Sequence, residues 1–214
     1  MSRLMCPFSA LTGDLTSALA KPLPGTDAHM LMAPRPRRVW PQGADVRDAA
    51  GLVLLFPDAN DRTHLVLTVR ADTLGRHSGQ VSLPGGVIEP GESFAHAALR
   101  EAHEEVALDR RLVRVAGALT PIDIPVSGFR LHPIVGLVDS RPVLSPADGE
   151  VARILDVALD DLISPGCVSD TTRERDGHQI VAPAFCVGGE EIWGATAMVL
   201  AELLSLVGWS RGKA

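Results

Sequence analysis

The stretch GGVIEPGE (residues 85–92), followed directly by SFAHAALREAHEEVAL (residues 93–108), decides the fold of this chain. Its two glycines and its Pro-Gly pair predict a tight loop in which the backbone can approach a ligand closely. Ser93 is a natural N-cap residue, so we expect a helix to begin there and to run to about Val106. A glycine-rich loop therefore leads straight into a helix.

This helix has two distinct faces. At about 100° per residue its apolar residues share one face, which we expect to pack on the core; they are Ala95, Ala98, Leu99, Ala102 and Val106. Glu101, Glu104 and Glu105 stand at i, i+3 and i+4 on a second face, where like charges repel by roughly a few tenths of a kcal/mol. No Lys or Arg follows at 108 or 109 to compensate them. A solvated acidic face is the ordinary interpretation, but a Mg²⁺ or Mn²⁺ ion held by hard oxygens fits this cluster better.

With these residues in register, the segment resembles the Nudix box of the Nudix hydrolases. The family pattern is Gly, five residues, Glu, seven residues, Arg-Glu, an apolar residue, any residue, Glu-Glu, any residue, Gly and an apolar residue. The matching positions are Gly86, Glu92, Arg100, Glu101, Glu104 and Glu105. Ala102 is a minimal apolar residue at its position, and Ala107 replaces the last glycine.

The resemblance implies an α/β fold, a Nudix-type α/β/α sandwich with a mixed sheet and a catalytic loop and helix. It also implies metal-dependent attack of water on a diphosphate linked to another group. By their positions in the motif, Glu101, Glu104 and Glu105 would hold Mg²⁺ or Mn²⁺. Glu92 and Arg100 would serve catalysis by bracing the loop against the helix as an ion pair.

A second signature lies just upstream. Residues 66–71 (VLTVRA) and 76–86 (RHSGQVSLPGG) resemble a motif of the coenzyme A pyrophosphatase branch, L-L-T-x-R-S/A followed at fixed spacing by Arg, Gly and F-P-G-G. Gly75 stands where that motif has its second Arg, and Arg76 beside it could substitute. This resemblance implies hydrolysis of coenzyme A or acyl-coenzyme A to 3′,5′-ADP and (acyl-)4′-phosphopantetheine.

The same region supplies positive charge for an anionic substrate. The formal net charge is −6, so a nucleotide needs a local basic cluster to attract it. The candidates are Arg62, His64, Arg70, Arg76 and His77. Of these we assign Arg70, Arg76 and His77 to substrate binding, together with Gly85 and Gly86. A surface charge at a strand end and an ordinary loop histidine are the plainer interpretations of Arg70 and His77.

The box does not by itself identify the general base. Glu105 is one candidate, although a glutamate that coordinates a metal has less basicity to offer. Glu150 is the other, because it ends the turn-rich segment SPADGE (residues 145–150) just before an apolar residue. Its position resembles a Glu-Val that follows the corresponding loop in the coenzyme A branch. Both candidates stay open.

The rest of the chain predicts a mixture of strands and helices. We expect strands at 51–56, 64–70, 112–119, 131–138 and 179–187, a helix at 9–20 and a closing amphipathic helix at 194–207. Residues 151–163 fit a strand or a helix equally well. Five prolines between residues 22 and 41 predict an extended arm that does not pack. We therefore divide the chain into an N-terminal extension with a proline-rich arm (1–44) and a Nudix domain (45–210).

The composition limits the kinds of partner that we expect for this protein. A chain of 214 residues that is 46% hydrophobic can build one real core. Its acidic balance, with five Phe, three Trp and no Tyr, argues against a nucleic-acid surface. No apolar run reaches the roughly 18 residues of a membrane span, and three dispersed cysteines indicate a reducing compartment. We expect a cytoplasmic enzyme with a small diphosphate substrate and neither nucleic acid nor membrane as partner.

Two other functions stay open. A Nudix pyrophosphatase could act instead on another nucleoside diphosphate derivative, such as ADP-ribose or a dinucleotide. A non-catalytic domain could bind a nucleotide as a sensor, although such a domain would be expected to lose a glutamate of the box, and none is lost here. The sequence also leaves open whether the proline-rich arm completes a homodimer.

Overall fold

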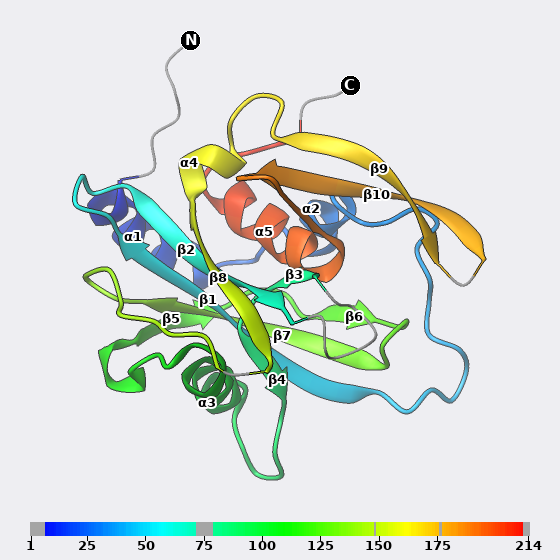
Figure 1. Cartoon of the computed structure of the whole chain (residues 1–214), viewed down its shortest axis with the longest axis horizontal. Helices are drawn as coiled ribbons and strands as arrows, with labels where there is room; N and C mark the ends of the chain where they lie inside the picture. The colour runs from blue at the N-terminus through cyan, green and yellow to red at the C-terminus, as the bar shows by residue number, and fades with distance from the viewer. Residues whose placement is uncertain (1–6, 72–78, 148, 176, 212–214) are drawn as a thin grey trace.

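The computed structural model describes residues 7–71, 79–147, 149–175 and 177–211. Its central feature is an eight-stranded sheet (Figure 1). The strands are β1 (Arg47–Pro57), β2 (Thr63–Arg70), β3 (Val81–Ser82), β4 (Gly85–Val87), β5 (Arg114–Ala118), β6 (Ile122–Ile124), β7 (Phe129–Leu137) and β8 (Val151–Ala158). The order is β3-β2-β1-β7-β5, with β4 on β1, β6 on β7 and β8 on β2. Because β1 and β7 run parallel while β1 and β2 run antiparallel, the predicted mixed sheet is confirmed.

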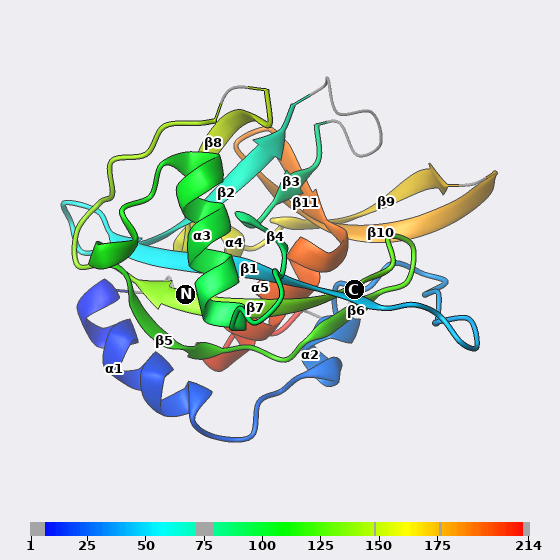
Figure 2. The same ribbon diagram turned by 90° about the horizontal axis from the view of Figure 1, so that it is seen from below.

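Helices cover both faces of this sheet. They are α1 (Phe8–Leu19), α2 (Thr26–Met30), α3 (Phe94–Val106), α4 (Leu159–Leu162), α5 (Gly194–Leu206) and the 3₁₀ helix η2 (Arg110–Leu112). Figure 2 shows α3 lying across one face, with α5 behind the sheet on the other. A second, antiparallel sheet of three strands, β9 (Val168–Arg175), β10 (His178–Val187) and β11 (Glu190–Trp193), stands beside α5. The predicted α/β class is therefore confirmed.

Strand β1 shows why both faces are covered. Its side chains alternate between two cores: Val53 and Leu55 pack with α5, whereas Leu52 and Leu54 pack with α3. Successive residues of a strand point to opposite faces, so a strand buried on both sides needs an uninterrupted apolar run. The run that predicted a strand at 51–56 also explains why this strand is central in the sheet.

Most of the predicted elements are confirmed with small shifts at their ends. Residues 151–163, left open between strand and helix, form both, β8 and then α4. The short elements β3, β4, β6, β11 and α2 were not predicted, because two to five residues are too few to show a period. Strand β9 was missed because its sequence, VSDTTRER, is mostly polar.

Helix α5 corrects one prediction, since it is not amphipathic. Buried residues lie all around it, among them Ala197, Leu200, Ala201 and Leu204. The large sheet covers one side, and α2 and β10 pack against the others. A helix that is covered on every side has no need of a polar face. No helix in the part of the chain that the structure describes is long and apolar enough to cross a bilayer.

The N-terminal extension corrects another prediction, because much of it packs. Leu15 of α1 and Met32, which follows α2, lie in the core shared with α5. Beyond them the backbone of Arg35 exchanges two hydrogen bonds with Val181 of β10, at 2.8 and 2.9 Å. Apolar side chains between the prolines outweighed the extended character that the prolines indicated. The domain boundary at residue 45 stays a prediction, but the segment before it is part of the same core.

A buried carboxylate of α5 holds this extension in place through hydrogen bonds. Glu202 of α5 is fully buried and accepts hydrogen bonds from the backbone N–H groups of Gly25 and Thr120, both at 3.0 Å, and from the Thr120 hydroxyl at 2.6 Å. His29 Nε2 lies 2.9 Å from the second carboxylate oxygen. Burial acts to raise the pKa of Glu202, and the hydrogen bonds from His29 and Thr120 outweigh it, so the pKa lies below its ordinary value.

We expect Glu202→Gln to destabilise the protein by about 1–3 kcal/mol, because the amide nitrogen would face donors. The pKa of Glu202 is lowered on folding, so its ionised carboxylate stabilises the folded state fully above the unfolded pKa of 4.5. This stabilisation is lost as the pH falls through the folded pKa. Urea unfolding at pH 7 and at pH 3 should show a difference from wild type that shrinks at low pH. Asp14→Asn, on the exposed face of α1, is the matched control; identical midpoints for both variants at pH 7 would contradict the assignment.

Candidate active site

A cavity of about 790 Å³ opens between the large sheet, the strands β10 and β11, the start of α5 and the arm before β1. Side chains or backbone from β2, β4, α3 and the turn before β8 meet on its wall. The residues that the sequence predicted and that line it are Arg70, Gly85, Gly86, Glu101, Glu105 and Glu150. Arg76 and His77 lie outside the described residues. The fold therefore gathers most of the predicted site from segments far apart in the chain.

Arg100 organises the loop and the helix. Its Nε and Nη2 donate to the two carboxylate oxygens of Glu92 at 3.1 and 3.0 Å, and Nη2 also donates to the carbonyl of Val87 at 3.0 Å. Its Nη1 donates to Glu101 at 2.7 Å and to Glu104 at 3.1 Å. The hydrogen bond with Arg100 lowers the pKa of Glu92, and the same contact raises the pKa of Arg100. Glu92 and Arg100 thus form the ion pair that the motif implied.

The prediction that the glutamate face lacks a compensating charge is wrong for two of its three members. Arg100, immediately before the cluster, binds both Glu101 and Glu104. The compensating charge precedes the cluster and does not follow it at position 108 or 109. Glu105 differs, because it accepts a hydrogen bond from the backbone N–H of Gly85 at 3.0 Å.

Glu105 is the most strongly perturbed carboxylate of the site. Burial raises its pKa to about 7, and the charges of Glu101 and Glu150 push in the same direction. The Gly85 N–H and the charge of Arg70 oppose this shift without cancelling it. Three carboxylates that face one cavity therefore repel one another, and a positive charge among them would relieve that repulsion.

The carboxylates of the site suit a divalent cation, although they do not already converge on one point. Within the described ranges, no three His, Cys, Asp or Glu side chains form a ready-made metal site. The side chain of Glu104 is 53% exposed and stays on Arg100, away from the cavity lining. Glu101, Glu105 and Glu150 do share the cavity, and carboxylate oxygens are the ligands that Mg²⁺ and Mn²⁺ prefer.

The two loop glycines are required by close approach. A Cβ on Gly85 would overlap the backbone of Ala50, and a Cβ on Gly86 would overlap the carboxylate of Glu101. The first clash involves rigid backbone, whereas the second involves the end of a side chain that can swing away. Gly86 therefore controls where Glu101 lies.

Gly86→Ala is expected to reduce kcat at least about tenfold while the protein stays folded, because the new methyl group displaces Glu101 from the cavity. Steady-state kinetics and a thermal melt of the same preparation would check this. Gly13→Ala on α1 is the control, since a Cβ there meets nothing within 4 Å. An unchanged kcat in Gly86→Ala would show that the position of Glu101 does not matter.

Helix α3 keeps an ordinary C-terminal cap, although Ala107 replaces the last glycine of the motif. Ala107 has φ +56°, a left-handed conformation that glycine adopts more easily. The Ala107 N–H bonds the carbonyl of His103 at 3.0 Å, and the Leu108 N–H bonds that of Ala102 at 3.4 Å. The substitution therefore costs some strain without changing the cap.

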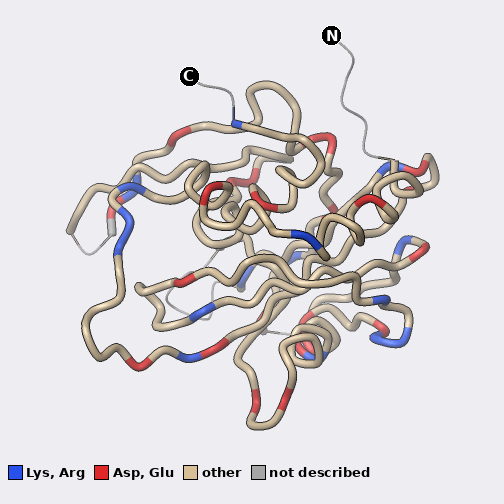
Figure 3. Tube along the Cα trace, turned by 180° about the vertical axis from the view of Figure 1, so that it is seen from behind, with Lys and Arg blue, Asp and Glu red and all other residues tan. Residues whose placement is uncertain are grey.

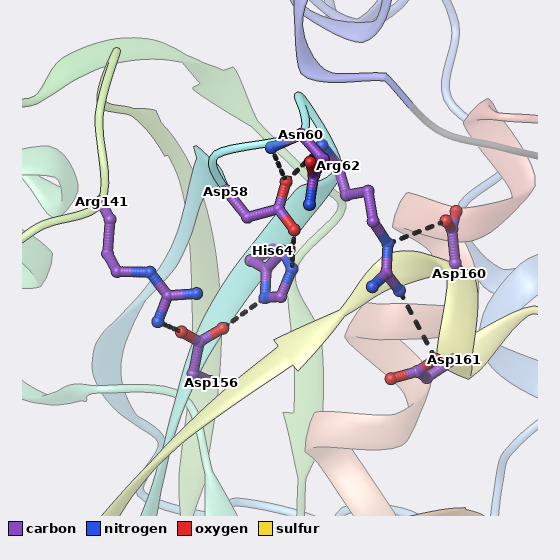
Figure 4. Close-up of polar contacts among 8 residues, drawn as sticks. All are labelled: Asp58, Asn60, Arg62, His64, Arg141, Asp156, Asp160 and Asp161. Atoms are coloured by element: carbon purple, nitrogen blue, oxygen red, sulfur yellow. Dashed lines mark hydrogen bonds and ion pairs between the residues drawn. The ribbon is translucent and has the colours of Figure 1, made fainter.

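Two residues of the predicted basic cluster face elsewhere (Figure 4). Arg62 pairs with Asp160 and Asp161 at 3.5 and 3.7 Å. His64 lies 2.5 Å from Asp156 and 3.6 Å from Asp58. They tie the β1–β2 turn to β8 and α4, and neither lines the cavity. Including them among the charges that attract the substrate was wrong, because aspartates hold both.

The structure also places residues at the site that the sequence did not assign to it. The cavity wall includes Arg37 and Arg38 of the arm, His178 of β10 and Trp193 of β11. The only sign in the sequence that the arm could bind an anion was its arginines between the prolines. No local pattern predicts that this segment lies beside a helix some 65 residues later. Only the tertiary structure brings them together.

This fold, with a Nudix box arranged along one cavity, defines a hydrolase of nucleoside diphosphate derivatives. The chain belongs to the Nudix hydrolase family: the NUDIX domain matches residues 46–168. Nudix hydrolases generally use divalent metal ions.

Relatives in sequence agree with that assignment. A protein named "Uncharacterized Nudix hydrolase NudL" from Enterobacter sp. (strain 638) is 33% identical over 163 residues, 76% of this chain and 83% of that protein. Its namesake from Citrobacter koseri is 34% identical over 165 residues, with the same coverage of 76% and 83%. The crystal structure of RenU, a Nudix hydrolase from M. smegmatis, matches with a TM-score of 0.48 and 22% identity, over 61% of this chain and 80% of that one.

Proposed function

We propose that this Nudix hydrolase cleaves the diphosphate bond of coenzyme A or an acyl-coenzyme A, yielding 3′,5′-ADP and (acyl-)4′-phosphopantetheine. One observation carries the proposal: Arg70, from the second signature, lines the same cavity as Glu101 and Glu105 of the Nudix box. The two motifs that suggested this substrate thus converge on one site. The volume of about 790 Å³ is also in the range of small-molecule sites.

The cavity has surfaces for both parts of such a substrate. The glutamates and Arg70 form a charged end suited to a diphosphate and its cation. Leu83, Phe129 and Trp193 contribute apolar and aromatic surface to the same cavity. Pantetheine is a long, mostly uncharged chain, so this surface supports a substrate that is anionic at one part and apolar at another.

In this proposal each residue of the site has a distinct role. Glu101, Glu104 and Glu105 hold the cation, with Glu150 on the same cavity; Glu104 must leave Arg100 to take part. When bound, the cation supplies positive charge that neutralises the diphosphate and makes water more acidic. Arg100 and Glu92 keep the loop fixed to the helix. Arg70 offsets phosphate charge, beside the backbone of Gly85 and Gly86.

The proton of the attacking water needs an acceptor, and two carboxylates can supply one. Oε2 of Glu105 already accepts the Gly85 N–H, which leaves Oε1 to receive a proton. Glu150 lies close enough for its charge to affect Glu105, and it is exposed at the cavity mouth. We place the general base at one of these two residues.

The substrate assignment predicts a definite product pair. Coenzyme A incubated with the protein and Mg²⁺ or Mn²⁺ in ¹⁸O-water should give 3′,5′-ADP and 4′-phosphopantetheine, one of them carrying the label, by mass spectrometry. A panel with acetyl-coenzyme A, ADP-ribose and diadenosine diphosphate would rank the substrates. Faster cleavage of ADP-ribose than of any coenzyme A compound would assign the enzyme to another nucleoside diphosphate derivative. Binding without cleavage of any of them would favour the sensor.

A cytoplasmic location is part of the proposal. It is supported by the cysteines, since Cys167 and Cys186 are both free thiols, and burial raises the pKa of Cys167 to about 11. Such a thiol is a poor nucleophile and behaves as a small core residue.

A further inference from the structure

The arm before β1 forms one wall of the active-site cavity. Pro34, Pro36, Arg37 and Arg38 all line it, together with the glutamates of the Nudix box. This segment lies outside the matched NUDIX domain, which begins at residue 46. It therefore adds something to the site that the family motif does not describe.

The arm is held firmly where it enters the cavity. Besides the backbone pairing of Arg35 with Val181, the Arg35 guanidinium pairs with Asp170 of β9 at 2.9 Å. Asp170 also binds Arg211 at 2.6 Å, and Arg211 donates to the carbonyl of Leu31 at 2.8 Å. The contacts of α2 with Glu202 fix the preceding segment. Arg37 and Arg38 thus follow an anchored backbone.

Arg37 lies far from the glutamates across the sheet. The paired residues Val87, Ala49, Leu131 and Ile122 form one row from β4 through β1 and β7 to β6. Three strand spacings of about 4.8 Å make this row about 14 Å wide. Gly86 and the glutamates stand at the β4 end. Arg37 lies toward the β6 end, since it lines the cavity with Ile122 and Asp123 of β6, and its charge contributes to the lowered pKa of Asp123.

Figure 3 shows the same separation on the scale of the whole chain. Basic positions gather on the segment that follows α2, ahead of an acidic position just before β1, whereas mostly acidic positions mark α3, and the two lie well apart in this view. The cavity runs between these two segments, so one of its ends is acidic and the other is basic.

The charge of Arg37 is available to a ligand. Asp123 is already paired with Arg130 at 2.8 Å, and that hydrogen bond is the main cause of its lowered pKa. Among residues that the structure describes, the Arg37 guanidinium contacts Met30 Sδ at 3.7 Å and no carboxylate lies within ion-pair distance of it. Arg37 is half-buried, and an anion would pair more strongly with it there than with a fully hydrated side chain.

We propose that Arg37 and Arg38 bind a second anionic group of the substrate, a phosphate monoester or a carboxylate separate from the diphosphate that is cleaved. The inference rests on the proposed function, since it takes the glutamate end as the reaction centre. In coenzyme A compounds the group is the 3′-phosphate of the ribose or the free carboxylate of a dicarboxylic acyl group. Both offer oxygens that a guanidinium can bind in a bidentate manner.

Pairs of substrates that differ only in this group test the proposal. Coenzyme A is compared with 3′-dephospho-coenzyme A, succinyl- with butyryl-coenzyme A, and 2′-phospho-ADP-ribose with ADP-ribose. We expect Arg37→Gln/Arg38→Gln to lower kcat/KM about 10- to 100-fold for the anionic member of at least one pair, mainly through KM. The partner that lacks the group should change less than about threefold. The pair that shows the effect identifies the group as phosphate or carboxylate.

The control Arg110→Gln/Arg114→Gln removes the same charge from exposed positions outside the cavity, and it should leave every ratio unchanged. Equal losses for both members of each pair, or no loss, would overturn the proposal. So would a fall in the thermal midpoint large enough to explain the loss. If coenzyme A compounds are not cleaved but the ADP-ribose pair shows the effect, the proposed substrate fails and the role of the arginines stands.

Calorimetry covers the case in which none of the pairs is cleaved. Wild type should bind 3′,5′-ADP more tightly than 5′-AMP, and the double variant should lose that preference. Equal affinity of wild type for the two nucleotides, with no cleaved pair showing the effect, would overturn the proposal.

Discussion

Glu105→Gln should lower kcat for diphosphate hydrolysis by at least about 100-fold, because the substitution removes a charge from the cation site and a candidate proton acceptor together. The carboxylate of Glu105 is half-buried, bonded to Gly85, and faces Glu101 and Glu150. An amide of the same shape keeps the packing but cannot neutralise a cation or take a proton. The measurement is kcat at saturating substrate and Mg²⁺, with a thermal melt of each preparation.

The matched control is Glu89→Gln, in the same loop but exposed to solvent, which should leave kcat unchanged. Glu150→Gln identifies the base. A loss as large as that of Glu105→Gln, with an altered acidic limb of the pH–rate profile and an unchanged melting temperature, would place the base at Glu150. Normal kcat and an unaltered profile would place it at Glu105. Full turnover by Glu105→Gln would contradict both the cation site and the base at this residue.

Removal of divalent cations should abolish hydrolysis, with a fall of at least about 1000-fold in EDTA and recovery on adding Mg²⁺ or Mn²⁺. Burial raises the pKa of Glu105, and the charges of Glu101 and Glu150 in the same cavity raise it further. A cation among these carboxylates would relieve their repulsion and neutralise the diphosphate. A bound cation also stabilises the folded chain by mass action, so it should raise the melting temperature.

Calorimetry with Mn²⁺ alone separates binding from turnover. The affinity should fall in Glu101→Gln and in Glu105→Gln, and it should stay normal in Glu89→Gln. Glu104→Gln tests whether the residue leaves Arg100 for the cation, since an unchanged affinity would leave it only the role of an ion-pair partner. Full activity in EDTA, or binding that none of the variants changes, would contradict the assignment.

Features that depend on neighbouring residues were predictable from the sequence. The Ser93 hydroxyl caps α3 by accepting the N–H of His96 at 3.3 Å, as its position indicated. The two faces of α3 follow from spacing within one helix, and the Glu92–Arg100 pair was implied by the resemblance to the Nudix box. The apolar run of β1 predicted a strand, because each of its residues meets a core on one face or the other. Such local patterns sufficed to predict the Nudix box and the α/β class.

Charge clusters in the sequence were a poorer guide. Arg62, His64 and Arg70 are close in sequence, yet only Arg70 reaches the cavity. An extended strand rises about 3.3 Å per residue, so the six residues from His64 to Arg70 span roughly 20 Å. The two ends of β2 therefore belong to different surroundings, one beside the aspartates of β8 and α4 and the other beside the glutamates. These surroundings depend on how β2 pairs with β8, which is distant in sequence.

The sequence by itself determined the motif, the elements that carry it and the family to which the chain belongs. Only the tertiary structure decided that the N-terminal arm packs, that Glu202 is a buried anchor, and that Arg37 shares a cavity with Glu105. The physical reason is the same in each case. Burial and cavity walls arise from contacts between segments tens or hundreds of residues apart, and no local spacing or periodicity records which distant segment will cover a side chain.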